Sequence, residues 1–171
     1  MAEFLWIFWS FSLLGWVLER LFAAVTRSPR RRRRCLLLLP LCPVYGLGMA
    51  AVLALPPSLR SGWPLYLWGG LTATSVEYIY HWWGETFLGV SFWDYTGVFG
   101  NLRGRVCLPF SLAWGLLLFP AVYLVTPPVL ALADRVPVGV TWWMLLAFTA
   151  DAVCSLRFLA VTHDLEAMRA A

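Results

Sequence analysis

The chain of 171 residues is strongly apolar, since 61% of its residues are hydrophobic and only 13% are charged. An ordinary soluble domain carries about 25% charged residues, so this composition excludes that class. The net charge of +4 is concentrated in five consecutive arginines, Arg30–Arg34. Because apolar segments flank this run on both sides, we expect it to contact anionic lipid, and we expect no nucleic-acid partner.

Five apolar segments follow one another, each close to the roughly 20 residues that a helix needs to cross a bilayer. The arginine run, a loop at 56–62, an aromatic loop at 84–105 and a second proline-containing stretch separate them. The sequence therefore predicts an all-α, polytopic membrane protein in which residues 1–171 form one integral membrane domain. The bundle of about five transmembrane helices is expected to cover residues 3–25, 36–55, 63–83, 106–126 and 138–161.

The arginines also predict the orientation of this bundle. The positive-inside rule assigns the loop with Arg27 and Arg30–Arg34 to the cytoplasm. Alternation then puts the N-terminus and the 56–62 loop outside, and the aromatic loop and the C-terminus in the cytoplasm. The assignment is self-consistent, because the two outer loops carry one arginine each, Arg60 and Arg135.

Cysteine, glycine and proline positions lead to three further expectations. The cysteines show no C-x-x-C spacing, which argues against a zinc site or a redox pair and predicts buried thiols at Cys35, Cys42, Cys107 and Cys154. Pairs of glycines predict close helix packing at Gly46, Gly48, Gly69 and Gly70. Prolines predict kinks in the second and fourth helices, at Pro40, Pro43, Pro109 and Pro120.

Polar side chains are scarce in the segments and, with this orientation, fall in the cytoplasmic half of the membrane. At 1.5 Å per residue, Glu19 lies about 24 Å from the outer end of its segment, and Glu77 about 20 Å from its own. Glu77, His81 and Glu85 are spaced four apart and so share one helix face. Because a charge at mid-bilayer costs about 2.5–3.5 kcal/mol, we predict a functional polar cavity that opens to the cytoplasm. The candidate functional residues are Glu19, Glu77, His81, Glu85, Asp94, Asn101, Arg103, Arg105, Ser111 and Asp151.

The same residues have plainer explanations. The acids are also accounted for by structural ion pairs with the arginines, which would orient the helices. His81 between two glutamates has the spacing of a metal ligand, but a packed neutral histidine is the commoner arrangement, and no metal or cofactor is expected. Asp94 is interpreted as the cap of a turn or of the start of a short helix. Arg103 and Arg105 are interpreted as ligands for phosphate, carboxylate or lipid headgroups.

Six short motifs follow one another over nearly the whole chain. They are Gly15-Trp16 with Glu19, CPVYGLG at 42–48, Glu77-Tyr78 with Glu85, Trp93-Asp94-Tyr95, NLRGRVCL at 101–108 and SLAWG at 111–115. On these motifs the chain resembles a family of small bacterial membrane proteins described as putative type IV ABC-transporter membrane components. The resemblance implies a multi-pass protein of the bacterial cytoplasmic (inner) membrane and makes transport the first functional hypothesis.

Three functions are compatible with these observations. The first is a transporter membrane component whose polar cavity handles a small polar or ionic solute. The sequence has no P-loop, so ATP hydrolysis would need an ATPase or another membrane subunit as partner. The second is an intramembrane enzyme on a lipid or isoprenoid headgroup, with Glu77, Glu85 and Asp94 in general acid/base or metal chemistry and Arg103 and Arg105 holding phosphate. The third is a membrane adaptor without catalysis.

Overall fold

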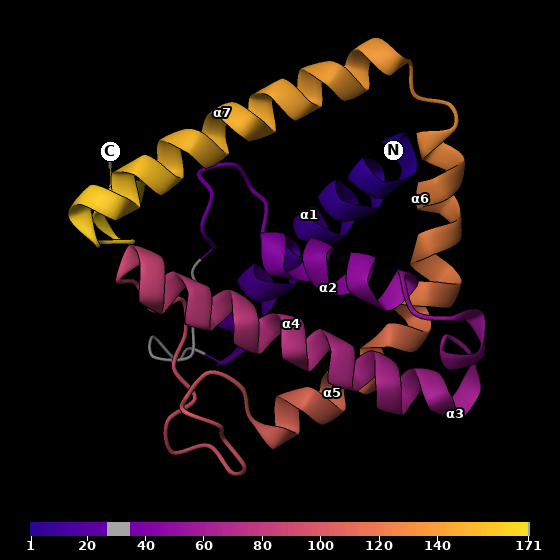
Figure 1. The fold of residues 1–171 in the computed structure, drawn as a ribbon, viewed down its shortest axis with the longest axis horizontal. Coiled ribbons are helices and arrows are strands. Elements are labelled where there is room, and N and C mark those ends of the chain that lie inside the picture. The colour runs from indigo at the N-terminus through magenta and orange to yellow at the C-terminus, as the bar shows by residue number, and fades with distance from the viewer. Residues whose placement is uncertain (27–34, 171) are drawn as a thin grey trace.

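The computed structural model describes residues 1–26 and 35–170, and this part of the chain is all-α (Figure 1). The predicted fold class is confirmed at this level. Arg27 and the run Arg30–Arg34, with the lipid contact expected there, lie outside the described residues.

Five helical stretches make up the described part, together with two short helices, η1 (Pro57–Leu59) and α8 (Ala167–Ala170). Two of the stretches are continuous runs of several helical elements. In chain order the stretches are α1 (Ala2–Thr26); α2 (Pro43–Leu53); α3 (Gly62–Pro64), η2 (Leu65–Gly69), α4 (Gly70–Trp83) and η3 (Gly84–Leu88); α5 (Leu108–Pro120), η4 (Ala121–Val125) and α6 (Thr126–Ala133); and α7 (Val138–Thr162).

Three helices are long and apolar enough to cross a membrane: Ala2–Val25, Leu108–Ala133 and Val138–Thr162. They correspond to the first, fourth and fifth predicted segments, so the structure supports three of the five expected spans. The third stretch, 62–88, has the length of a span but carries threonine, serine, glutamate and histidine side chains along α4.

The second predicted span, 36–55, is wrong in its first part, because α2 covers only Pro43–Leu53. Residues 35–42 are not helical. A proline disfavours the helical conformation of the residue before it, and Pro40 and Pro43 follow each other closely. Cys42 is accordingly extended, with φ −114° and ψ 90°, and Pro43 occupies the first turn of α2, where its missing N–H costs nothing. The prolines therefore delay the helix instead of kinking it.

The fourth segment contains a local irregularity after Pro120. The turn η4 is a π-helix, a widened turn of the kind that often accompanies a helix irregularity. The hydroxyl of Thr126 donates to the carbonyl oxygen of Ala121 at 2.8 Å. Pro109 produces no kink, because it lies in the first turn of α5.

The helices pack in the order α1 on α2, α2 on α4 and α4 on α5 (Figure 1). Glycines allow the close crossings. A side chain at Gly46 would overlap the carbonyl oxygen of Phe8, and a Cβ at Gly70 would lie 3.2 Å from the Cα of Gly115. At Gly48, in contrast, a side chain would meet open space. The predicted packing role is thus supported for Gly46 and Gly70 but not for Gly48.

Helix α7 runs along one edge of the molecule (Figure 1), and hydrogen bonds near its two ends join it to the rest of the chain. The indole N–H of Trp6 donates to the hydroxyl of Thr141 at 3.1 Å near the start of α7. At its end, Nδ1 of His163 donates to the carbonyl oxygen of Leu88 at 2.6 Å. Much of its apolar surface is exposed, as expected for a helix that faces lipid.

Candidate functional site

Glu77 lies at the meeting point of α4, α5 and the loop 89–107. Its side chain is 2% exposed. Tyr95 of the loop donates its hydroxyl to Oε1 at 3.3 Å, and Trp114 of α5 donates its indole N–H to Oε2 at 2.8 Å. The carboxyl group therefore connects three parts of the chain, and each of its oxygens accepts a hydrogen bond from an aromatic side chain.

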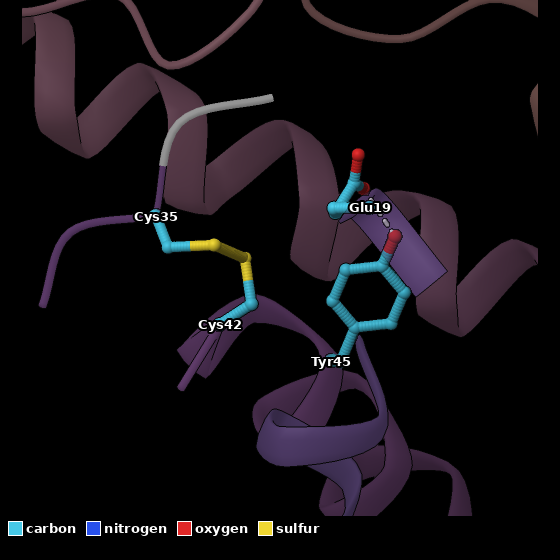
Figure 2. The surroundings of a disulfide bond; sticks show 4 residues. All are labelled: Glu19, Cys35, Cys42 and Tyr45. Carbon is cyan, nitrogen blue, oxygen red and sulfur yellow. Dashed lines mark hydrogen bonds between the residues drawn. A yellow bond between two sulfur atoms is a disulfide. The ribbon is translucent and has the colours of Figure 1, made fainter. Parts of the chain in front are cut away.

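Glu19 of α1 enters the same region through Tyr45 of α2. The hydroxyl of Tyr45 donates to Oε1 of Glu19, as Figure 2 shows. The ring of Tyr45 also packs edge-to-face on Trp114, with centroids 5.3 Å apart. The structure thus brings two of the predicted site residues, Glu19 and Glu77, into one cluster joined by Tyr45 and Trp114.

A cavity of about 360 Å³ lies next to this cluster, between α1, α2, α4 and the α5–η4 stretch. Its walls are mostly aliphatic and aromatic, and Glu77, Tyr45 and Trp114 are the lining residues with polar groups in their side chains. This differs from the polar cavity that the sequence led us to expect. Of the acids predicted to line it, only Glu77 belongs to the walls of this cavity, and the side chains around Glu77 make it apolar.

A second polar cluster lies at the end of α4, around Glu85. Oε1 of Glu85 is 3.1 Å from Nε2 of the buried His81, and Oε2 accepts from Nε of Arg105 at 2.7 Å. Arg105 also donates through Nη1 to the hydroxyl of Tyr78 at 2.8 Å, with its guanidinium over the Tyr78 ring. The predicted residues His81, Glu85 and Arg105 are therefore brought together.

The guanidinium group of Arg105 makes hydrogen bonds to other side chains of the protein. Desolvation lowers its pKa, but the hydrogen bonds to Glu85 and Tyr78 outweigh this effect, and the pKa is raised. The bidentate fork that would grip a phosphate is divided between these two side chains. The geometry therefore favours a role in fixing the loop to α4.

The arrangement around His81 is not that of an activated serine. The hydroxyl of Ser91 lies 3.3 Å from Nε2 of His81, but Glu85 contacts the same nitrogen. In a serine–histidine–acid relay the acid holds the other ring nitrogen, leaving one nitrogen for the nucleophile. Ser91 moreover donates to the carbonyl oxygen of Trp93 at 2.9 Å. Within the described part of the chain, no group of three or more His, Cys, Asp or Glu residues is arranged to hold a metal ion.

Three other predicted site residues shape the backbone at or beside the loop. Asp94 accepts from the amide of Thr96 at 2.7 Å, which is the turn expected for this residue. Asn101 donates to the carbonyl of Val98 at 3.0 Å and accepts from the amide of Gly104 at 3.2 Å. Ser111 donates to the carbonyl of Cys107 at 3.1 Å in the first turn of α5. These contacts are local, and none of the three residues lines the cavity.

Arg103 and Asp151 also lie outside the cavity. Arg103 is exposed at the tip of the loop, in the left-handed conformation with φ 53°. Asp151 of α7 accepts from the backbone amides of Leu38 at 3.2 Å and Leu39 at 2.9 Å, and from the hydroxyl of Ser155 at 3.0 Å. It holds the non-helical segment 35–42 against α7.

The cysteine prediction is wrong for three of the four residues. Cys35 and Cys42 form a disulfide across seven positions (Figure 2), and Cys154 is exposed. Cys107 is a buried thiol, as expected. The disulfide arises because the chain between Cys35 and Cys42 is not helical and returns on itself, a consequence of Pro40 and Pro43 that the spacing rule for cysteines does not capture.

Sequence reasoning also missed four aromatic or hydroxyl residues that contact the predicted site residues: Tyr78, Ser91, Tyr95 and Trp114. Three of them lie in the short motifs of the sequence: Tyr78 in Glu77-Tyr78, Tyr95 in Trp93-Asp94-Tyr95 and Trp114 in SLAWG. An aromatic residue with a polar hydrogen is read as an interfacial anchor unless its partner is known.

The site is thus a buried acidic cluster beside an apolar cavity, in a protein with helices that can span a membrane. Comparison with curated proteins and with solved structures gives no match. A family model described as "Putative ABC-transporter type IV" matches residues 6–156, which include every residue that lines the cavity. Because the match covers most of the chain, this protein belongs to that family.

Proposed function

We propose that the protein is the membrane component of a transport assembly and that the cavity between α1, α2, α4 and α5 is its solute-binding site. The observation that carries this proposal is the 360 Å³ cavity with Glu77 in its wall. Ligand sites are typically cavities of about 300–1,000 Å³ that are largely apolar, with a few polar groups that fix orientation.

Other subunits complete the proposed assembly. The sequence has no P-loop, so an ATP-driven cycle requires an ATPase from another chain. In the proposed orientation the N-terminus and the 56–62 loop are outside, and the loop 89–107 and the C-terminus face the cytoplasm of a bacterium, where such a partner would bind. Arginine counts support this orientation.

The apolar lining changes the solute that we propose. A small polar or ionic solute would leave its hydration shell for a mostly aliphatic wall, which is costly without hydrogen bonds. A solute with an apolar part fits the lining better.

The enzyme alternative receives less support, because Arg105 is held by Glu85 and Tyr78, and Arg103 lies at the loop tip away from the cavity.

Affinity purification from native membranes tests the proposal. We expect mass spectrometry to find an ATP-hydrolysing subunit and a bound small molecule with the tagged protein. Gly48→Leu should lose the small molecule, because a leucine there would extend into the open space of the cavity, while the subunit should still co-purify. Gly139→Leu is the matched control, since Gly139 also faces open space but does not line the cavity. Absence of both a partner ATPase and a small molecule sensitive to Gly48→Leu would contradict the proposal.

A further inference from the structure

We infer that the solute of this cavity is a membrane lipid, of which one hydrocarbon chain lies in the cavity while the head group stays outside it. The inference deepens the proposed function and rests on it, because it names the solute class for the same cavity. Four features of the described residues support it: the polar groups of the walls, the volume of the cavity, its length along α1 and the exposure of its walls.

The polar groups of the walls are engaged within the protein. Among the described residues that line the cavity, Glu77, Tyr45 and Trp114 carry polar groups in their side chains. Both oxygens of Glu77 accept hydrogen bonds, one of them from the indole N–H of Trp114, and the hydroxyl of Tyr45 donates to Glu19. A polar head group in the cavity would have to displace these hydrogen bonds or leave its own polar atoms unpaired, which is costly in an apolar site. A hydrocarbon chain requires no hydrogen-bond partner.

The volume of the cavity suits one chain. A water molecule has a share of about 30 Å³ in the liquid, so the cavity volume of 360 Å³ corresponds to about a dozen groups of that size. A methylene group is of similar size. The cavity therefore has room for one chain of about a dozen carbons, but not for the two chains and head group of a whole phospholipid.

The length of the cavity matches one leaflet of a bilayer. On α1 the lining residues run from Phe11 to Leu21, ten steps of about 1.5 Å each, or about 15 Å along the helix. The hydrocarbon core of a bilayer is about 30 Å thick, so one leaflet contributes about 15 Å. The lining residues extend from near the middle of α1 toward its C-terminal end. A lipid chain that lies along them would therefore keep the depth that it has in its own leaflet.

The exposure of the walls indicates the route of entry. Two walls belong to α1 and to the α5–η4–α6 stretch, both long and apolar enough to cross a membrane. The lining side chains Leu18, Leu21 and Leu117 are 40%, 59% and 44% exposed at the surface of these helices. Hydrocarbon surrounds such a surface in a membrane, so a lipid can place one chain in the cavity and leave its second chain and its head group in the bilayer.

Photocrosslinking with two phosphatidylglycerol probes tests where each part of the lipid lies. One probe carries a diazirine in the middle of an acyl chain, and the other carries it in the head group. The full chain is reconstituted in phosphatidylglycerol vesicles that contain one probe at a time, and mass spectrometry locates the adducts after irradiation.

Two residues report on the two environments of the probe. Met49 lines the cavity and is 3% exposed, so a chain in the surrounding bilayer does not reach it. Leu116 is 63% exposed and does not line the cavity, so it reports contact with the surrounding lipid. We expect the chain probe to label both Met49 and Leu116, and the head-group probe to leave Met49 unlabelled.

Two glycine variants show whether the label reaches Met49 through the cavity. Gly48→Leu should remove most of the Met49 adduct, because each methylene displaced from the cavity lowers occupancy about fourfold, and two lower it about fifteenfold. Labelling of Leu116 should not change. Gly139→Leu is the matched control and should leave both adducts unchanged, since Gly139 also faces open space but does not line the cavity. Size-exclusion profiles show whether each variant folds.

The outcomes distinguish this inference from the function on which it rests. Labelling of Met49 by the head-group probe would overturn the inference and leave the cavity as a solute site. Labelling of Leu116 without Met49 by the chain probe, or a Met49 adduct that persists in a folded Gly48→Leu, would also overturn it. In both of these cases the small molecule recovered with the purified protein still decides whether the cavity binds a solute. Because the two probes are compared on the unaltered protein, the inference is decided even when Gly48→Leu does not fold.

Discussion

At the scale of single residues, aromatic donors bind the buried acid Glu77 and the half-buried acid Glu19. Glu77 accepts from Tyr95 and Trp114, and Glu19 accepts from Tyr45. Each donor is a large ring with one polar hydrogen, so the same side chain both packs against apolar neighbours and satisfies an oxygen. This explains how acidic groups are placed inside a chain that is 61% hydrophobic.

The two donors of Glu77 lead to the first prediction. Trp114→Phe and Tyr95→Phe each keep a ring and remove one hydrogen bond from a buried oxygen, which costs about 1–3 kcal/mol. We expect Trp114→Phe to lower stability more, because its bond is shorter, 2.8 Å against 3.3 Å. Unfolding of the purified variants by heat or by SDS measures the difference. Equal stability of Trp114→Phe and the parent would show that this bond contributes nothing.

Arg105 leads to the second prediction. Arg105→Lys keeps the charge but cannot hold Glu85 and Tyr78 together with one planar fork, so the loop 89–107 should loosen. We expect faster hydrogen exchange of the loop amides and little change in α1 or α7. Because the pKa of Arg105 is raised in the folded protein, its charge stabilises the fold at every pH below the ordinary pKa of arginine, and this contribution is lost only as the pH rises above that range. The charge of Arg105 should therefore add no pH dependence between about pH 6 and 9. Unchanged exchange in Arg105→Lys would contradict the proposed fixing role.

At the scale of helices, glycine and proline decide how closely the elements approach and where they begin. Gly46 and Gly70 allow α2 to meet α1 and α4 to meet α5. Pro40 and Pro43 delay α2, so its N-terminus is joined to the disulfide-closed segment 35–42. As a result α2 has only 11 residues and lies within the bundle.

Two neighbouring glycines of α2 form a matched pair for the third prediction. Gly46→Ala should destabilise the protein by about 1–3 kcal/mol, because the new methyl group overlaps the backbone of α1. Gly48→Ala should be neutral or stabilise by up to about 1 kcal/mol, because alanine favours the helix and faces open space. Unfolding midpoints of both variants are compared in one detergent. The reverse order of stability would exclude the crossing of α1 and α2 described above.

At the scale of the whole molecule, the charges and the disulfide give opposite indications of orientation. The arginine counts favour a cytoplasmic location for the end of the bundle that carries the disulfide. Disulfides persist in oxidising compartments, and cytosolic thiols are kept reduced. If the arginines determine the orientation, Cys35 and Cys42 are free thiols in the cell and form the disulfide only under oxidising conditions.

Labelling of cysteines in intact cells provides the fourth prediction. With an impermeant reagent we expect Ser61→Cys to react from outside and Arg103→Cys to be protected, since both positions are exposed at opposite ends of the chain's long helices. Alkylation before lysis should then trap Cys35 and Cys42 as thiols. Labelling of Arg103→Cys from outside, together with an intact disulfide, would invert the proposed orientation.

The sequence by itself determined the class of the protein and the local conformations. Long apolar segments act through their own length and composition, so α1, the α5–α6 stretch and α7 were predictable as spans. The turn at Asp94 was predictable because the side chain binds an amide only two residues away.

Only the tertiary structure decided which acids share a site. Glu77 and Trp114 are 37 positions apart, and Asp151 and Leu39 are 112 apart, so nothing in the local pattern relates them. Depth along a helix did not distinguish Glu77 from Asp151, because depth concerns the height of a residue and not the direction of its side chain. The apolar cavity and the Cys35–Cys42 disulfide depend in the same way on how separate segments pack.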